Sequence, residues 1–176
     1  PKRSNGENMI IEGRVWKFGD NINTDLIIAG KYKYDTLDIK EMAKYTFEAL
    51  RSDFYKKVKE GDIIVAGRNF GCGSSREQAP LVLKALGIKV IVAESFARIF
   101  YRNAINLGLL ALECNGISRA VEEGDVVRIK LEEGTVENIS SGATLNFKPL
   151  PKLILEIFKE GGLVPYVKKN RRIRIE

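Results

Sequence analysis

Residue types suited to chemistry are concentrated in the segment NFGCGSSREQAP, which spans residues 69–80. Two glycines flank a cysteine, and Ser74, Ser75 and Arg76 follow at once. Backbone N–H groups of a glycine-rich loop can bind an anion, and a helix that begins after the loop adds a favourable dipole. The two hydroxyls and the guanidinium add donors that suit a carboxylate. The segment therefore predicts an anion-binding loop or a serine activated beside a cation.

Two other interpretations of this segment compete with the first. Ser75 could be the N-cap of a following helix, with Gln78 completing a capping box and with Arg76 and Glu77 as a solvated pair. A phosphate-binding loop is disfavoured, because the segment has neither Gly-Lys-Ser/Thr nor the Gly-x-Gly-x-x-Gly pattern. Spacing alone leaves helix capping and anion binding open.

A second candidate segment is NTDLIIAGKYKYD, which spans residues 23–35. Thr24 and Asp25 place a hydroxyl beside a carboxylate. Cations and phenols then alternate in four consecutive residues, which are Lys31, Tyr32, Lys33 and Tyr34. This pattern suits recognition of a small di- or tricarboxylate, and it makes all six residues candidates for the site. The alternative is a basic edge strand, in which alternating lysines discourage pairing with another chain.

The composition excludes several kinds of site. The chain of 176 residues has no histidine, so a Ser-His-Asp triad within it is impossible. It has two cysteines, whereas an iron–sulfur cluster usually takes three or four. A self-contained zinc site is also disfavoured without these ligands. We therefore expect this chain to bind no metal and no cofactor by itself.

The net charge of +6 and the pI of about 9.3 raise the possibility of an acidic partner. Much of the excess lies in the C-terminal run VKKNRRIRIE, residues 167–176, which is typical of a solvated tail. A nucleic-acid-binding module is the alternative from a different class. The sequence lacks the aromatic RNA-binding signatures and the zinc knuckle of such modules, so we expect no nucleic-acid partner.

Length and hydropathy predict a single domain over residues 1–176, with a basic tail at 170–176. No apolar run approaches the roughly 18 residues that cross a bilayer, so no membrane contact is expected. The polar start has no apolar signal region, which favours the cytoplasm. Met9 is a candidate for the native start, and residues 1–9 are expected to lack regular structure.

Hydrophobic periodicity predicts the elements that position the two segments. A strand at 10–19 precedes the segment at 23–35, and a helix at 38–50 with Asp38 as N-cap follows it. A β-α-β-α-β unit then comprises strands 61–67, 89–95 and 109–114 and helices 78–87 and 95–108, the latter helix capped by Ser95. Strands near 126–131 and 135–139 and a helix at 151–162 complete an α/β fold with a parallel sheet and an antiparallel extension.

Four stretches of the chain resemble one protein family: GRVWKFGDNINTDLII, VKEGDIIVAGRNFGCGSSREQAP, IKVIVAESFARIFYRNAINLGL and EGGLVPYVKK. The sequence is similar, over about residues 10–169, to the small subunits of the aconitase-superfamily hydro-lyases, in particular those of 3-isopropylmalate dehydratase. The resemblance implies a swivelling β/β/α domain like the last domain of aconitase. It also implies a heterodimer or heterotetramer with a large subunit that carries a [4Fe–4S] cluster, and a chain that is active only with that subunit.

The resemblance also implies roles for individual residues. Ser74 corresponds to the catalytic base, Ser75 and Arg76 bind substrate carboxylate, and Asp25 orients the polar network of the active site. The loop at about 29–35 corresponds to the part that selects the substrate. The implied reaction is dehydration and rehydration of 2-isopropylmalate to 3-isopropylmalate in leucine biosynthesis, with the cluster iron as Lewis acid and Ser74 as the proton acceptor.

The sequence departs from the family pattern at three positions. Gln78 replaces a usual histidine, Ala29 replaces a usual proline, and Lys33 stands where an apolar residue is more common. Lys33 could bind an additional carboxylate. A tricarboxylate such as homoaconitate or citrate, or another substituted malate, is therefore an open alternative substrate.

Overall fold

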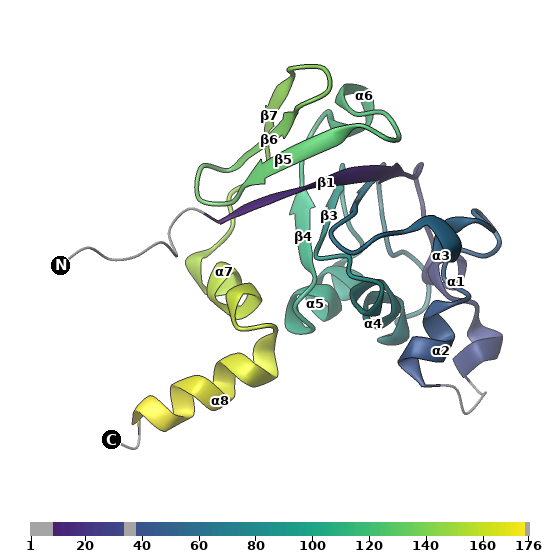
Figure 1. The fold of residues 1–176 in the computed structure, drawn as a ribbon. Helices are drawn as coiled ribbons and strands as arrows, with labels where there is room; N and C mark the ends of the chain where they lie inside the picture. Colours follow the sequence, from purple (N-terminus) through teal and green to yellow (C-terminus); the bar gives the residue numbers. More distant parts are fainter. Residues whose placement is uncertain (1–8, 34–37, 175–176) are drawn as a thin grey trace.

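The chain folds around one seven-stranded mixed sheet in the strand order β4-β3-β2-β1-β5-β6-β7 (Figure 1). The structure is a computed structural model, and it describes residues 9–33 and 38–174. Over these ranges, no helix has the length and apolar character needed to cross a membrane. The prediction that residues 1–9 lack regular structure concerns mostly residues outside the described ranges; the Met9 carbonyl accepts from the Leu131 N–H.

The parallel half of the sheet consists of β1 (Ile10–Lys17), β2 (Ile63–Ala66), β3 (Val90–Ala93) and β4 (Leu110–Glu113). Strands β2 and β3 are buried along their whole length, as expected for apolar strands covered on both faces. The predicted β-α-β-α-β unit is confirmed. Its strands are joined by α4 (Gln78–Ala85) and α5 (Arg98–Asn106), which lie side by side against this half of the sheet (Figure 1).

The antiparallel half begins at β1, which pairs with β2 on one side and with β5 on the other. It consists of β5 (Val126–Lys130), β6 (Thr135–Asn138) and β7 (Thr144–Asn146). The predicted strands at 126–131 and 135–139 are confirmed, whereas β7 was not predicted. It is only three residues long, and two of its three side chains are exposed, so its sequence carries little apolar signal.

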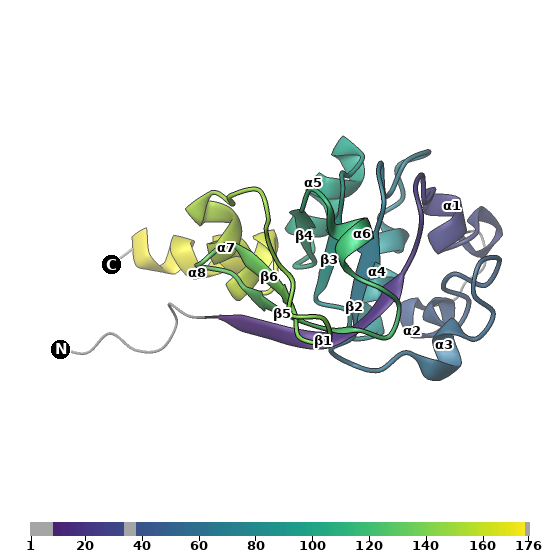
Figure 2. The same ribbon diagram turned by 90° about the horizontal axis from the view of Figure 1, so that it is seen from above.

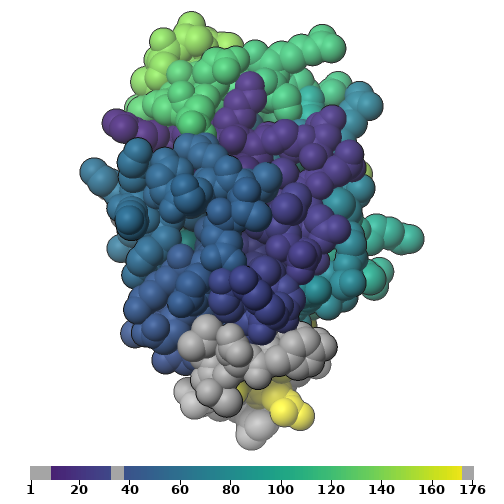
Figure 3. Space-filling view, turned by 90° about the vertical axis from the view of Figure 1, so that its right-hand side faces the viewer, coloured from purple at the N-terminus to yellow at the C-terminus, as the bar shows by residue number. Residues whose placement is uncertain are grey.

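The remaining helices gather at two opposite ends of the molecule (Figures 1 and 2). One end holds α1 (Thr24–Ile27), the 3₁₀ turn η1 (Gly30–Lys33), α2 (Ile39–Ala43) and α3 (Phe54–Lys57), and Figure 3 shows this face. The other end holds α7 (Lys152–Lys159) and α8 (Leu163–Arg174). The short helix α6 (Ile117–Ala120) follows β4.

Two predictions about helices were wrong. Ser95 does not cap α5: the N-cap is Ala97, and the Ser95 hydroxyl accepts a bond from the Asn69 N–H instead, at 2.8 Å. The helix predicted over 38–50 has its expected Asp38 cap but ends at Ala43. Its continuation is broken at Phe47, which has a φ of 56° and donates its N–H to a carbonyl of α1.

The C-terminal basic run was expected as a solvated tail, and its described cations Lys168, Lys169 and Arg171 are exposed. Residues up to 174 belong to helix α8, which was not predicted and which begins after two glycines with positive φ, Gly161 and Gly162. These glycines end α7, which corresponds to the helix predicted at 151–162, and turn the chain into the second helix, α8. Leu163 and Tyr166 of α8 pack against the core, which explains why a strongly basic segment is helical.

A buried asparagine holds the antiparallel half together. Asn138 is fully buried, and its Nδ2 donates to the Ala120 carbonyl and to Asp125 Oδ2, each at 2.9 Å. Its Oδ1 accepts from the N–H groups of Ser140 and Ser141, at 3.0 and 3.2 Å. Every hydrogen-bonding position of the amide is therefore used, and these bonds connect α6, the start of β5 and the turn after β6.

Asn138→Ala should lower the free energy of unfolding by about 3 kcal/mol, because it leaves several buried polar groups without partners. Urea unfolding followed by circular dichroism measures the loss. Asn146→Ala, at an exposed position of β7, is the matched control and should change stability by less than about 0.5 kcal/mol. Equal losses in both variants would contradict the structural role of Asn138.

Candidate functional site

Three loops meet at the carboxyl ends of the parallel strands β1, β2 and β3. The Gly71 N–H donates to the Ile22 carbonyl at 2.7 Å, and the Thr24 N–H donates to the Cys72 carbonyl at 2.9 Å. The loop after β3 joins them, because the Phe70 N–H donates to the Ser95 carbonyl at 3.1 Å. This edge is where open α/β sheets bind ligands, and it brings both candidate segments together.

Two glycines are needed for the shape of residues 69–77, which we call the serine loop. Gly71 and Gly73 have φ values of 83° and 89°, in the region that side chains disfavour. A Cβ on Gly71 would lie 2.2 Å from the Phe100 ring, and one on Gly73 would lie 2.6 Å from Asn23 Oδ1. The glycines therefore allow the loop to lie directly against helix α5 and against the start of α1.

The serine loop does not continue into the helix through a capping box. Helix α4 begins at Gln78, its N-cap position is Glu77, and no side chain caps it. Ser75 lies outside the helix, and Arg76 pairs with Asp25 rather than with Glu77. The capping interpretation is therefore wrong, and the hydroxyls of the loop remain available for other roles. Pro80 lies in the first turn of the helix, as expected.

Arg76 and Asp25 form an ion pair across the site, with 2.9 Å between Nη1 and Oδ1. The same carboxylate oxygen accepts from the Gly30 N–H at 2.8 Å. The pKa of Asp25 lies below its usual value, first because of the Gly30 N–H and then because of the guanidinium. Asp25 is thus ionised at neutral pH, and Asn23 fixes its backbone by accepting from the Asp25 N–H at 2.8 Å. The pair holds Arg76 in place beside the two serines.

Gly30 provides the space for the guanidinium. A Cβ at this position would lie 2.7 Å from Arg76 Nη1 and 2.8 Å from Nη2. The close approach of the guanidinium is therefore the reason for a glycine at position 30. Backbone conformation is not the reason, because the φ of Gly30 is not in the positive range. Sequence reasoning missed this role, because the contact joins residues that are 46 positions apart.

Gly30→Ala should displace Arg76 from Asp25 and raise the pKa of Asp25 toward its usual value. The Gly30 N–H bond is retained in this variant, so only the contribution of the guanidinium is lost. Carbon-detected NMR titration of the Asp25 carboxyl measures the shift. Gly19→Ala is the matched control, because a Cβ there meets nothing within 4 Å. An unchanged Asp25 pKa in Gly30→Ala would show that Arg76 is not displaced.

Thr24 and Ser74 are connected by a hydrogen bond. The Thr24 hydroxyl is almost fully buried and donates to the Ser74 carbonyl at 2.7 Å, so it orients the serine backbone. The Ser74 side chain is exposed, and its hydroxyl has no hydrogen-bond partner among the described residues. The structure therefore gives Ser74 a fixed backbone and a free hydroxyl at the surface of the site.

A cavity of about 470 Å³ opens beside the serine loop, between the loop and the first turns of α5. Thr24, Ser75 and Arg76 line it, together with Arg98 and Asn103 of α5. The Asn103 Nδ2 donates to the Ser75 hydroxyl at 3.4 Å. Sequence reasoning missed Arg98 and Asn103, although they are the first and sixth residues of a helix that was predicted. The available signal was the position of this helix directly after a strand end.

The lysine and tyrosine residues of the second segment are placed differently from one another. Tyr32 is buried, stacks on Tyr45 with centroids 4.3 Å apart, and donates its hydroxyl to Glu48. Lys31 is exposed, lies 4.0 Å from Glu48 and contacts the Tyr32 ring. Residues 30–33 form the turn η1, so the alternative of a basic edge strand is wrong over these residues. Tyr34 lies outside the described residues.

The described residues do not offer a metal centre. Across 9–33 and 38–174, no three side chains of His, Cys, Asp or Glu are grouped so that they could hold a metal ion. Cys72 lies in the serine loop, whereas Cys114 is buried after β4, where burial raises the pKa of its thiol to about 11. These residues do not fit an iron–sulfur cluster.

Comparisons with known proteins agree with this geometry. Residues 2–116 match the family described as the aconitase C-terminal domain. The isopropylmalate/citramalate isomerase small subunit of Methanocaldococcus jannaschii is 54% identical over 92% of this chain and 95% of that protein. The 3-isopropylmalate dehydratase small subunit 1 of Methanopyrus kandleri is 52% identical over 92% of this chain and 94% of that protein.

A solved structure shows the same fold. The crystal structure of 3-isopropylmalate dehydratase (leuD) from Methanocaldococcus jannaschii superposes with a TM-score of 0.88 and 48% identity, and it covers 94% of this chain and 98% of that one. The predicted swivelling β/β/α fold class is thereby confirmed. The chain belongs to the aconitase C-terminal domain family, among the small subunits of 3-isopropylmalate dehydratase.

Proposed function

We propose that this chain is the small subunit of a hydro-lyase that converts 2-isopropylmalate to 3-isopropylmalate, a step of leucine biosynthesis. The observation that carries the proposal is the pairing of Arg76 with Asp25 beside two exposed serines, at the sheet edge where ligands bind. The names of the relatives, which are about half identical over most of the chain, support the choice of reaction.

Each site residue has a defined task in this proposal. Ser74, as its alkoxide, takes the proton from the carbon next to a substrate carboxylate and becomes the neutral hydroxyl; its side chain is free to do so, and its backbone is fixed by Thr24. Arg76 holds the carboxylate with the N–H groups that Asp25 does not occupy. The loss of hydroxide from the neighbouring carbon leaves an alkene, and water returns with the positions of H and OH exchanged.

Ser75 and Asn103 complete the binding surface. Ser75 presents its hydroxyl to the same cavity as Arg76, and Asn103 orients that hydroxyl from helix α5. With the free backbone N–H groups of the serine loop, these donors would stabilise the negative charge that develops on the carboxylate when the proton leaves. Asn103 is thus a positioning residue in this proposal, since it acts through Ser75.

The site is open on one side and is completed, in this proposal, by a large subunit in a heterodimer or heterotetramer. The [4Fe–4S] cluster would lie on that subunit, because the two cysteines of this chain cannot hold it. The absence of histidine from the chain supports the same arrangement, since every histidine that the reaction needs must come from the partner. Alone, the chain would bind substrate weakly and turn nothing over.

The substrate is a substituted malate in the leading proposal, and a tricarboxylate in the alternative. One relative is named for both isopropylmalate and citramalate, so two substituted malates share a site of this kind in that protein. Lys33 favours the tricarboxylate. In this proposal the loop at about 29–35 selects the substrate, and a lysine in that loop could pair with a third carboxylate.

Lys33→Leu should raise the preference for isopropylmalate over homoaconitate and citrate, because it removes a cation that only a third carboxylate needs. The experiment compares kcat/KM for the three substrates in the complex with the cluster-loaded large subunit. Lys40→Leu, on the exposed face of α2, controls for the loss of one charge. If the ratios do not change in Lys33→Leu, Lys33 has no part in substrate choice. If the wild-type complex prefers citrate, the leading proposal for the substrate is wrong.

A further inference from the structure

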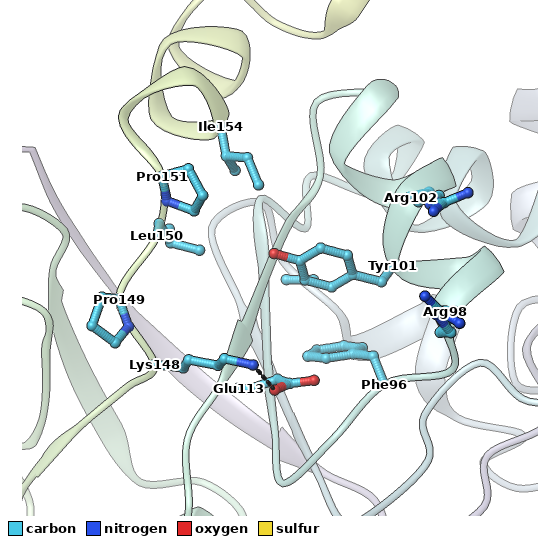
Figure 4. A pocket seen from close by; sticks show the side chains of 11 residues that line it. Phe96, Arg98, Tyr101, Arg102, Glu113, Lys148, Pro149, Leu150, Pro151 and Ile154 are labelled. Carbon is cyan, nitrogen blue, oxygen red and sulfur yellow. Dashed lines mark ion pairs between the residues drawn. The ribbon is translucent and has the colours of Figure 1, made fainter.

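A second cavity, of about 460 Å³, lies between helix α5, the end of β4 and the segment that leads into α7 (Figure 4). One wall carries the rings of Phe96 and Tyr101, with centroids 6.0 Å apart. Leu150 and Ile154 lie on the opposite wall. We call this space the Tyr101 cavity. Its volume and its apolar walls suit a small organic ligand, and the proposed reaction does not use it.

One loosely paired acid and base lie together at an edge of the Tyr101 cavity. Lys148 Nζ is 3.7 Å from Glu113 Oε2, which is longer than a good hydrogen bond. The Lys148 side chain is 76% exposed, whereas that of Glu113 is 33% exposed. A backbone bond of 2.7 Å from the Lys148 N–H to the Glu113 carbonyl keeps the two residues adjacent. Such a weak pair can open at little cost to receive a ligand with both charges.

The Tyr101 hydroxyl points across the cavity (Figure 4) and has no hydrogen-bond partner among the described residues. Burial, and to a lesser degree the charge of Glu113, raises the pKa of Tyr101, so the hydroxyl stays a donor. Arg98 and Arg102 of helix α5 also line the cavity (Figure 4). The lining therefore has three cations and one carboxylate, so Glu113 is the group in it that can pair with a ligand ammonium.

We propose that the Tyr101 cavity binds a hydrophobic α-amino acid. The ligand's ammonium pairs with Glu113, its carboxylate pairs with Lys148 and accepts from the Tyr101 hydroxyl, and its side chain packs between the two apolar walls. A dicarboxylate is disfavoured because it would bring a second negative charge to Glu113. A neutral hydrocarbon is disfavoured because it would leave the charged pair and the hydroxyl without new partners.

Phe96 connects this cavity with the site. It lines both cavities, and the residues on either side of it bond to Phe70: the Phe70 N–H donates to the Ser95 carbonyl, and the Ala97 N–H donates to the Phe70 carbonyl. Gly71 and the serine loop follow Phe70 directly. A ligand that contacts the Phe96 ring would therefore lie next to the backbone bonds that hold Phe70 and the start of the serine loop, although its binding does not require the proposed reaction.

Isothermal titration calorimetry of the full chain with L-leucine tests the proposal. We expect saturable binding of L-leucine, and binding about tenfold or more weaker for 3-methylbutylamine, 4-methylpentanoate and L-aspartate. The first two probes each lack one charge, and the third lacks the apolar side chain. If L-leucine gives no saturable heat, or binds no better than the probes that lack a charge, the proposal is overturned.

Three variants assign the binding to this cavity. Glu113→Gln and Lys148→Met should each weaken L-leucine binding about tenfold, because each removes one charged partner. Ile154→Trp should abolish it by filling the space. Lys130→Met is the matched control, because Lys130 forms a similarly loose pair, 3.9 Å from Glu133, elsewhere on the sheet. Unchanged affinity in Lys148→Met and Ile154→Trp, with thermal unfolding like that of wild type, would also overturn the proposal. Because only binding to this chain is measured, failure here leaves the proposed reaction untouched.

Discussion

Ser74→Ala is expected to reduce kcat for isopropylmalate isomerisation about 10³-fold or more in the complex with the large subunit, with little change in KM. The variant removes the proposed proton acceptor but retains the Ser74 carbonyl that Thr24 holds, so the loop keeps its shape. Arg76 and Ser75 still bind the carboxylate. Steady-state kinetics measures both constants, and analytical ultracentrifugation confirms that the complex still forms.

Ser52→Ala is the matched control for this prediction, because Ser52 is also exposed and makes no hydrogen bond through its side chain among the described residues. It should behave like wild type. A Ser74→Ala complex that retains near-normal turnover would show that another group takes the proton. A rise in KM with unchanged kcat would instead make Ser74 a binding residue, because binding equally strong in the ground and transition states alters KM alone.

Arg76→Lys is expected to lower kcat/KM about 10- to 100-fold, mostly through a higher KM. A lysine keeps the positive charge but has no planar fork, so it cannot serve Asp25 and the substrate carboxylate at once. The 2.9 Å bond to Asp25 and the close contact with Gly30 show how closely the guanidinium fits its place. The shorter reach of the ammonium would leave one of the two carboxylates unpaired.

Arg119→Lys, at the exposed position of helix α6, controls for a general effect of replacing an arginine and should leave the kinetics unchanged. The double variant Asp25→Asn/Arg76→Lys separates the two roles of the Arg76 guanidinium, which are pairing with Asp25 and binding the substrate carboxylate. If Arg76 serves both carboxylates, the double variant should lose less than the product of the single losses, because the residues share one interaction. Fully multiplicative losses would mean that Asp25 and Arg76 act independently.

Much of the fold followed from local patterns, because local physics decides those elements. Helix α4 was predicted over 78–87 and spans Gln78–Ala85, with Pro80 in its first turn and Gly87 in a positive-φ conformation just after its end. The missed elements are short or depend on distant contacts. Phe47 ends α2 through a bond to α1, and α8 is stabilised by Leu163 and Tyr166 against the core. No local pattern contains such information.

The site was predicted in part for the same reason. Residue types singled out the serine loop and the Thr24–Asp25 pair as separate candidates, and the structure shows that they meet at one edge of the sheet. The ion pair between Asp25 and Arg76 joins residues 51 positions apart, so spacing could not predict it. Ser95 shows the opposite error, because its type suggested a helix cap while its actual partner, the Asn69 N–H, lies 26 positions away.

The most direct test of the proposed function adds increasing amounts of this chain to a fixed amount of cluster-loaded large subunit, and follows the conversion of 2-isopropylmalate to 3-isopropylmalate. The account predicts no turnover by either protein alone, and activity that rises with added chain to a plateau at a fixed subunit ratio. Turnover by the large subunit that is unchanged when this chain is added would contradict the account, as would full activity of this chain without its partner.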